Sequence, residues 1–572
     1  MSTLSALIKN GQQIQMRSGL AQLNPNDLVQ VVEPSGYVYP VGTIDYDTTQ
    51  TTASIVPQTA IDSTPENSTI YHRHSVITDF EGSIYVGQAG TANDAKVCKL
   101  TGSGVRVFKR LVGLDATRCI NMHIASLGNG NIVSTFYRVT AQKHSFAIID
   151  KNGTVVVPST DMASSIESGA GSTPSHVAYH SMIPLASGGF AVAFQNSGGT
   201  AVQLATYDQT GSLTLAPTTI QTLTGTAAVV WMRMGQLLNG NLVVAMRSPT
   251  TAGPNPEGTT FVIVTTAGVS VKTNTVVDNL TAVPYITGLV QCWPELNILG
   301  NNFAIGGLTG TGNTSDPQAY LATYDATGTL QGSKYLSSSS TASGSGIGQT
   351  TFPQCCLLND GTKFWMAYAG ATLGGGNQGS LVSMTLAGVA TEYGALIPFA
   401  SGPVLPADGN SSADMALIGG NFAIFQSPAA GANVTTAPFV TLWPMPDQVT
   451  GSYVPLPGTT TTIGSAAATR GALVVKIVPT GLSAIFAYDN QNAANMFIAA
   501  NKLFNSAIIG INQGGVGPAS PGVLTGVNVG ATNAPINPIP ATAEGVLFDH
   551  SAGTPHGNKG RLYRAGVLQT GL

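Results

Sequence analysis

The chain has 572 residues, of which 68 are glycine and 9% carry a charge, and its net charge is −4. The short stretch 558–564 offers only a weak group of Lys and Arg, which argues against an extended nucleic-acid surface because phosphate neutralisation needs grouped cations. Apolar runs fall short of the roughly 18 residues of a membrane helix, and residues 1–16 are too polar for a signal peptide. We therefore predict a soluble protein made in a cytoplasm, with no membrane span and no nucleic-acid partner.

Residues 1–70 precede any repeat and contain one readable hairpin. Its two strands lie within Asn24–Gly42, on either side of a Pro-Ser-Gly turn. This hairpin resembles short segments found in bacteriophage fibre and virion proteins. We predict that residues 1–70 form a β-rich N-terminal attachment segment.

One sequence pattern recurs seven times between residues 76 and 449. Each copy has an apolar stretch, a Gly/Asn/Asp turn, a hydrophobic strand, a further strand, a second Gly turn and a last strand. Asn-Gly, Gly-Gly and Asp-Gly pairs supply the positive φ that tight hairpin turns need. The copies are 48 to 61 residues apart, near the length of propeller blades, as counted from Ile84, Ile132, Phe190, Leu242, Phe303, Phe364 and Phe422.

Each copy contains two hairpins and hence four strands. The sequence therefore predicts an all-β protein with a seven-bladed β-propeller over residues 71–450, since a closed ring leaves only short edges. A row of β-sandwiches or a β-solenoid would give similar patterns. If the propeller is right, the residues that set the period are buried at equivalent places between blades.

Residues 451–572 follow a Gly/Thr-rich break and are also β in character. Within them, 494–512 is expected to form a short helix followed by a strand, and 514–545 is rich in Gly, Pro and Asn. Such a long apolar and nearly uncharged arm is ordered most readily against a neighbouring subunit. We predict a C-terminal β-rich assembly domain in a homo-oligomer, whose deletion leaves the propeller folded and blocks assembly.

Repeated carboxylates precede the second Gly turn of several copies, at Asp150, Asp208 and Asp325. An Asp in this place caps its own turn. Catalysis needs a unique and asymmetric group of residues, so these are predicted to be structural. The Asp-box of sialidases is absent.

Histidine pairs are the next candidates for chemistry, as possible metal ligands or proton carriers. None has an identifiable third metal ligand nearby, so each is assigned a structural or solvated role; the pairs are His72 with His74, His176 with His180, and His550 with His556. The glycine-rich Ser343–Gly348 lacks the helix and acidic residue of a dinucleotide site. We predict no catalytic, cofactor-binding or metal-binding residue.

Cysteines are odd in number and lack metal-ligand spacing. Adjacent cysteines on a strand would point to opposite faces, which disfavours a disulfide or chelate between them. All are therefore predicted to be buried thiols: Cys98, Cys119, Cys292, Cys355 and Cys356.

Two groups of proteins resemble the repeat. Its pattern, clearest at Leu185–Asn196 followed by Tyr207–Gly211, resembles the repeat of large bacterial surface and adhesin proteins with propeller-type units. The whole chain is more similar to bacteriophage virion proteins of the tail fibre or nozzle kind. This resemblance implies a structural tail component without enzymatic activity, located in the virion and acting in assembly and host attachment. Its partners would be other tail subunits and a host surface glycan or protein receptor.

Other functions stay open. Phage tailspikes and several propellers cut glycans, so the main alternative is a glycan-binding or glycan-cleaving tail adhesin. A bacterial surface adhesin is a further alternative. Release of reducing ends from host capsule or lipopolysaccharide separates the enzyme from the structural protein, which is expected to release none.

Overall fold

Two compact units divide the chain, and each is described by itself. The larger comprises Ser54–Pro479 and Ile485–Asn501, and the smaller comprises Met1–Ala53, Thr480–Ala484 and Lys502–Leu572. The computed structural model describes residues 2–3, 28–32, 37–40, 44–50, 54–62, 76–79, 83–89, 93–101, 105–117, 119–164, 180–197, 199–223, 231–248, 258–277, 295–310, 317–336, 355–371, 377–396, 412–418, 421–427, 438–445, 461–463, 475–480, 483–490, 495–511, 545–549, 559–564 and 567–568. Within these ranges, we find no helix whose length and apolar content would let it cross a membrane.

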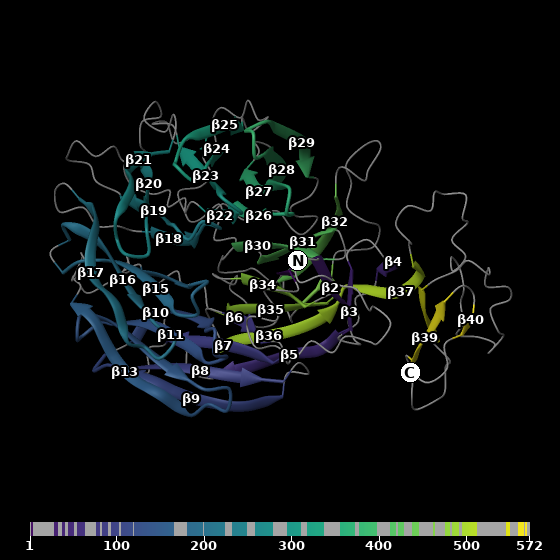
Figure 1. The fold of residues 1–572 in the computed structure, drawn as a ribbon, viewed down its shortest axis with the longest axis horizontal. Coiled ribbons are helices and arrows are strands. Elements are labelled where there is room, and N and C mark those ends of the chain that lie inside the picture. The colour runs from purple at the N-terminus through teal and green to yellow at the C-terminus, as the bar shows by residue number, and fades with distance from the viewer. Residues whose placement is uncertain are drawn as a thin grey trace. The chain divides into compact units, whose positions relative to one another are not determined.

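The larger unit is a β-propeller of eight four-stranded antiparallel sheets. The fold class is thus confirmed, whereas the predicted number of seven blades is wrong. The inner strands of blades 1 to 7 contact one another in turn, and the outer strands lie at the periphery of the ring (Figure 1). The inner strands are β6 (Val76–Thr78), β10 (Cys119–Ser126), β14 (His180–Pro184), β18 (Trp231–Gln236), β22 (Glu295–Leu299), β26 (Cys355–Asn359), β30 (Ser412–Ile418) and β34 (Val475–Thr480).

Three further strands complete each blade in the order inner, second, third and outer. The second strands are β7 (Ile84–Ala89), β11 (Ile132–Arg138), β15 (Phe190–Gln195), β19 (Leu242–Ser248), β23 (Asn302–Gly310), β27 (Lys363–Ala371), β31 (Asn421–Ser427) and β35 (Ser483–Asn490). The third strands are β8 (Asp94–Leu100), β12 (Lys143–Ile149), β16 (Ala201–Tyr207), β20 (Gly258–Val264), β24 (Pro317–Tyr324), β28 (Asn377–Thr385), β32 (Phe439–Pro444) and β36 (Asn495–Lys502). The outer strands are β9 (Arg106–Leu114), β13 (Val155–Ser164), β17 (Leu213–Thr222), β21 (Ser270–Val276), β25 (Leu330–Leu336), β29 (Ala390–Leu396), β33 (Thr461–Thr462) and β5 (Ser54–Asp62).

The eighth blade joins the two ends of the propeller sequence. Its first three strands are β34, β35 and β36, and its outer strand is β5, which precedes all other blades in the chain. β5 pairs antiparallel with β36, with Met496 opposite Asp62 and Ile498 opposite Thr59. The predicted boundaries at residues 70 and 450 therefore fall short of the propeller on both sides, because they leave out the strands that close it.

The residues that set the period are buried at equivalent places, as predicted. Each of the seven is 0 to 1% exposed and stands at or near the start of a second strand. Each also lies opposite a large apolar residue on the third strand, for example Phe303 opposite Tyr324 and Phe422 opposite Trp443. The apolar period in the sequence thus reports a real structural register.

Truncating one of these side chains tests their contribution. We expect Phe303→Ala to lower the free energy of unfolding by about 3–5 kcal/mol, because it leaves a cavity beside Phe261 and Tyr324. Phe303 stacks on Tyr324 with ring centroids 5.2 Å apart. Chemical denaturation measures the loss, and a change below about 1 kcal/mol would contradict this packing.

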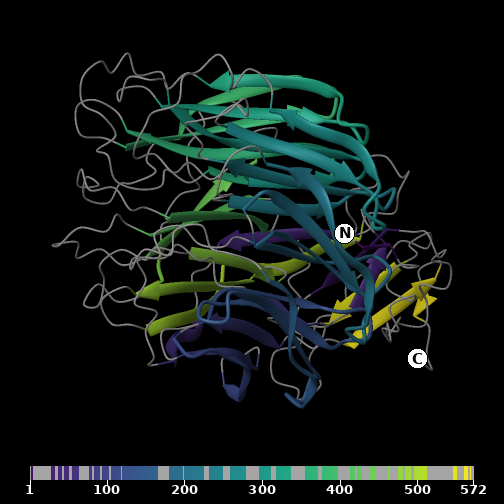
Figure 2. The same cartoon turned by 90° about the vertical axis from the view of Figure 1, so that its left-hand side faces the viewer.

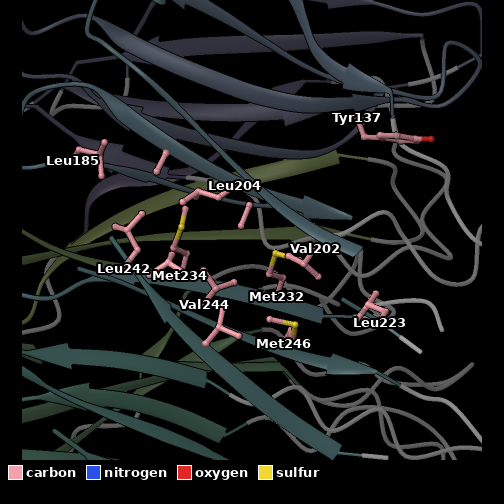
Figure 3. Close-up of a cluster of buried hydrophobic side chains, with 14 of the residues drawn as sticks. Tyr137, Leu185, Val202, Leu204, Leu223, Met232, Met234, Leu242, Val244 and Met246 are labelled. Carbon is pink, nitrogen blue, oxygen red and sulfur yellow. The ribbon is translucent and has the colours of Figure 1, made fainter. Parts of the chain in front are cut away.

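Hydrophobic clusters fill the spaces between neighbouring blades. Between blades 3 and 4, Met232 and Met234 of β18 lie among Leu204, Leu242 and Val244 (Figure 3). Blades 8 and 1 share a cluster of the same kind, in which Ile485 and Ile498 meet Val76, Ile84 and Val86. The ring is therefore closed by side-chain packing as well as by the β5–β36 pairing.

Glycines at the turns between third and outer strands allow this close packing. Gly328 has a φ of 75°, and a Cβ there would lie 3.2 Å from Ile263 Cδ1 and Phe261 Cε2 of the preceding blade. A side chain at this position would be strained in its backbone and crowded against that neighbour. In side view, the strands of successive blades accordingly lie close above one another (Figure 2).

The smaller unit is made of short sheets. β1 (Ser2–Thr3), β2 (Leu28–Val32) and β3 (Tyr37–Pro40) form one sheet, which confirms the N-terminal hairpin. β4 (Ile44–Gln50) pairs with β37 (Phe504–Ile511), and β38 (Gly545–Asp549), β39 (Lys559–Arg564) and β40 (Val567–Leu568) form a third sheet. The predicted helix within 494–512 is wrong, because β36 and β37 occupy this stretch as strands.

Candidate functional site

The inner strands carry polar residues at one equivalent position of the ring. This position lies opposite the residue of the second strand that comes three places after the period-setting residue. The inner-strand residue found there differs from blade to blade. Positions nearby are mostly apolar, so this level departs from the repeat. In blades 2 to 7 the residues are His123, Ser181, Arg233, Glu295, Cys356 and Asp414.

A β-bulge places His123 at this level. The pairing of β10 with β11 shifts between Ile120 and His123, and Asn121 has a φ of 56°. Asn is one of the few residues that tolerates this backbone conformation. A bulge re-aims the side chains that follow it, and it sets His123 opposite Thr135.

Three imidazoles from two blades meet beside the bulge. The ring centroid of His180, on β14 of blade 3, lies 4.8 Å from that of His123 and 4.9 Å from that of His144, on β12 of blade 2. Thr135 Oγ1 is 2.8 Å from His180 Nε2. Tyr137 also packs against His144, with ring centroids 5.0 Å apart.

Burial keeps the imidazoles of His123 and His144 neutral. It lowers the pKa of His123 to about 4, an effect to which the nearby positive charge of Arg233 adds and which a hydrogen bond to the His180 backbone opposes. Burial also lowers the pKa of His144 to about 3, with a further contribution from His123. His144 is 1% exposed, whereas His123 keeps some exposed surface. At neutral pH, His123 is therefore an uncharged and partly exposed imidazole, which is the form that accepts a proton.

A cation stands next to the histidines on the following inner strand. Arg233 Nε lies 3.6 Å from Glu295 Oε2, and both side chains are mostly buried. This contact links blades 4 and 5 and orients the guanidinium, whose planar group matches a carboxylate or sulfate. On blades 7 and 8, Asp414 Oδ2 accepts a hydrogen bond from the Ile477 backbone N–H at 3.0 Å and lies 3.0 Å from Lys476 Nζ.

The depressed histidine pKa values make stability depend on pH. The folded-state pKa of His144 lies below its unfolded value of 6.5, so the unfolded chain takes up the proton first as the pH falls. The contribution of neutral His144 to the free energy of unfolding is therefore fully present above pH 6.5. It decreases as the pH falls toward the folded-state pKa, by up to about 1.4 kcal/mol per pH unit. We expect His144→Phe to weaken this dependence between pH 7 and 5 in denaturation experiments. An unchanged dependence would show that His144 is not held neutral.

Repeated aspartates cap their turns, as predicted. Asp150 Oδ1 accepts hydrogen bonds from the backbone N–H groups of Asn152 and Thr154, at 2.9 and 2.7 Å. Asp208 and Asp325 make equivalent bonds in blades 3 and 5. The bonds that Asp150 accepts, above all from Thr154, lower its pKa. These carboxylates hold turns and do not face a common site.

Most histidines singled out from the sequence lie outside the described residues, namely His72, His74, His176, His550 and His556, as does Ser343–Gly348. His180 is described, and its assignment as merely structural is incomplete because it joins His123 and His144. Cys98, Cys119 and Cys356 are buried thiols, as predicted; Cys292 and the side chain of Cys355 lie outside the described part of the chain. Among described residues, no group of three His, Cys, Asp or Glu has metal-binding geometry.

Comparison with known proteins gives distant structural likenesses only. No family model and no curated protein sequence matches this chain. Among solved structures, an ulvan lyase of polysaccharide lyase family 25 bound to -[GlcA(1-4)Rha3S]- is similar with 10% identity and a TM-score of 0.41, over 81% of this chain and 98% of that chain. An α-L-arabinanase of Penicillium chrysogenum is similar with 9% identity and a TM-score of 0.29, over 58% of this chain and 94% of that one.

These comparisons also correct one prediction. The sequence predicts a protein without enzymatic activity, whereas several of the similar solved structures are polysaccharide lyases and glycosidases, alongside a prolyl endopeptidase. At such low identities and TM-scores the likeness assigns no activity to this chain, and any activity must come from its own residues. The repeat pattern describes what the blades have in common, whereas the candidate site lies at an inner-strand position where the blades differ. The sequence patterns alone therefore indicate no site.

Proposed function

We propose that the protein is a carbohydrate-active enzyme that cleaves an acidic polysaccharide by β-elimination. The observation that carries this proposal is the convergence of His123, His144, His180 and Arg233 from blades 2 to 4. These residues comprise a neutral base, two supporting imidazoles and a guanidinium. A base beside an anion-binding group is what proton abstraction next to a sugar carboxylate requires.

In this reaction, Arg233 binds the carboxylate of a uronic acid and stabilises the negative charge that develops on it. The neutral imidazole of His123 takes the proton from the carbon that bears the carboxylate. The electron pair left behind forms a double bond to the next ring carbon, and the bond from that carbon to the glycosidic oxygen breaks. The leaving oxygen then takes up a proton, so the reaction consumes neither water nor an oxidant.

Hydrolysis is less well supported by the same residues. Glycoside hydrolases use two carboxyl groups on either side of the scissile bond, one of them as a proton donor. Glu295 lies against Arg233, and Asp414 is held by Lys476 and the Ile477 backbone. Both carboxylates therefore serve contacts between blades, which favours elimination over hydrolysis.

Product analysis in isotopic water tests the proposal. The purified chain is incubated with polyuronates, such as polygalacturonate and alginate, and with a sulfated glucuronate polymer, in water enriched in ¹⁸O. When products are analysed before the reducing-end hemiacetal exchanges its oxygen with the water, elimination gives an unsaturated, ultraviolet-absorbing end and no ¹⁸O, whereas hydrolysis gives saturated ends that carry ¹⁸O. Saturated, labelled ends or the absence of any cleavage would contradict the proposal, the latter in favour of a glycan-binding protein.

The resemblance to phage tail proteins stays a prediction. A tail location, partner tail subunits and homo-oligomer formation are compatible with a polysaccharide-cleaving adhesin, because such an enzyme acts on the surface to which a phage attaches. Electron microscopy of particles with an antibody against the chain would test this assignment.

A further inference from the structure

The outer strand of blade 1 differs in charge from its counterparts. β9 carries Arg106, Lys109 and Arg110, all of them exposed. The outer strands β13, β17 and β29 carry no Lys or Arg, and β21 and β25 carry one Lys each. In a chain with 23 Lys and Arg and a net charge of −4, this strand is a local concentration of positive charge.

Neighbouring cations on the same blade are engaged in structural contacts. Lys99 of β8 donates a hydrogen bond to Lys151 O at 3.1 Å, lies 3.7 Å from Asp79 and stands over the Tyr85 ring. Lys96 is paired with Asp94. On β9 itself, Arg110 Nε donates to Gly153 O at 2.5 Å, which fixes this side chain across the boundary to blade 2. Arg106 and Lys109 precede it on the same exposed strand.

The geometry of β9 fits an extended anionic chain. It is the last strand of its sheet and lies at the periphery of the ring (Figure 1). Arg106 and Arg110 are at most about 13 Å apart along the strand, whose register shifts between Arg106 and Phe108, and exposed Val107 and Leu111 each follow one of these cations. An edge strand also has backbone N–H and C=O groups that hydroxyl groups can bond.

Edge protection and nucleic-acid binding account less well for the charges on β9. Charged residues on an edge strand prevent pairing between sheets. The equivalent outer strands carry one Lys or none, so edge protection does not require three cations; these strands are β13, β17, β21, β25 and β29. Nucleic acid needs more phosphate contacts than three cations supply, and single strands need exposed aromatic stacking platforms. Phe108, the aromatic residue of β9, is only partly exposed.

We propose that β9 is a second contact surface for an anionic polysaccharide, outside the ring of inner strands, which holds the polymer while His123 and Arg233 act on another part of it. This inference rests on the proposed function for its substrate class. It predicts that long chains bind more tightly than short ones, because a long chain engages both places at once.

Binding of the full chain to immobilised polygalacturonate tests this proposal. Arg106→Gln/Lys109→Gln should weaken binding about tenfold at low ionic strength, and it should lower the dependence of affinity on salt. Lys272→Gln/Lys334→Gln removes the same charge from the outer strands of blades 4 and 5, and it should bind like the unaltered protein. In cleavage assays, the β9 variant should raise KM for the polymer and leave kcat on a short oligosaccharide unchanged.

Each outcome bears on one proposal separately. Equal binding by the β9 variant and the unaltered protein, or no binding of polyuronate by either, would overturn the role of β9. Preferential binding of single-stranded DNA that the same variant abolishes would assign β9 to nucleic acid instead. If no polymer is cleaved but polyuronate binding is lost in the β9 variant, the proposed reaction fails and the contact surface stands.

Discussion

Replacement of His123 by Gln should reduce the rate of eliminative cleavage by about 10²- to 10⁴-fold, the usual contribution of a general base. Gln keeps hydrogen-bonding capacity but cannot accept the proton. Because the loss lies in the chemical step, kcat should fall with little change in KM. Steady-state kinetics on a uronate polymer measures both parameters, and circular dichroism checks that the variant is folded.

Two further readouts distinguish a base from a structural residue. Added imidazole should partly restore the activity of His123→Gly, which a lost packing contact would not permit. The activity of the unaltered protein should stay level from pH 7 to 5 and decline as the pH falls toward about 4, because protonated His123 cannot accept a proton. Activity of His123→Gln within twofold of the unaltered protein would remove His123 from the mechanism.

Truncation after residue 450 should prevent the propeller from folding. It removes three of the four strands of blade 8, and with them Ile485, Phe486 and Tyr488, which are almost fully buried. Burial of each large apolar side chain contributes about 1.5–3 kcal/mol, and the faces of blades 7 and 1 would lose their partners as well. The sum is comparable to the whole stability of a typical protein. The truncated chain should be insoluble or lack a cooperative thermal transition.

A second truncation provides the matched control. A chain ending at residue 511 keeps all eight blades together with β1 to β4 and β37 of the smaller unit, and it loses the sheet of β38, β39 and β40. It should unfold cooperatively near the transition of the full chain. The sequence-based expectation that residues 451–572 are dispensable for folding is thereby narrowed to the residues after 511. A soluble, cooperatively unfolding chain that ends at 450 would show that β34, β35 and β36 are not needed to close the ring.

Much of the fold can be predicted from the sequence because every blade packs its residues in the same way. Large apolar residues recur where the second strand enters the core, and Gly and Asp recur where the chain turns. The eighth blade also has this signal, since Ile477 to Phe486 contains an apolar stretch, a Thr-Gly turn and a hydrophobic strand. The repeat pattern does not reveal it because its copy is incomplete, and its outer strand is supplied from residues 54–62, far away in the sequence.

The candidate site could not be predicted in the same way. His123, His144 and His180 have no common spacing, because they come from the first and third strands of blade 2 and the first strand of blade 3. His123 is also displaced by the bulge at Asn121, which periodicity does not reveal. The sequence does contain a usable signal. One inner-strand position changes from His to Ser, Arg, Glu, Cys and Asp between blades, although packing of the repeated blades does not require a polar residue there.

The pairing of β5 with β36 imposes an order on folding during synthesis. A ribosome adds about 5–20 residues per second, so β5 emerges roughly 20–90 s before its partner exists. Seven blades can form one after another from local hairpins during this interval, while the first face of blade 1 stays uncovered. Closure is then the last event, and it joins strands separated by most of the chain. The nascent chain therefore passes through an open ring whose two end blades expose apolar faces. This is the stage at which a chaperone is most needed.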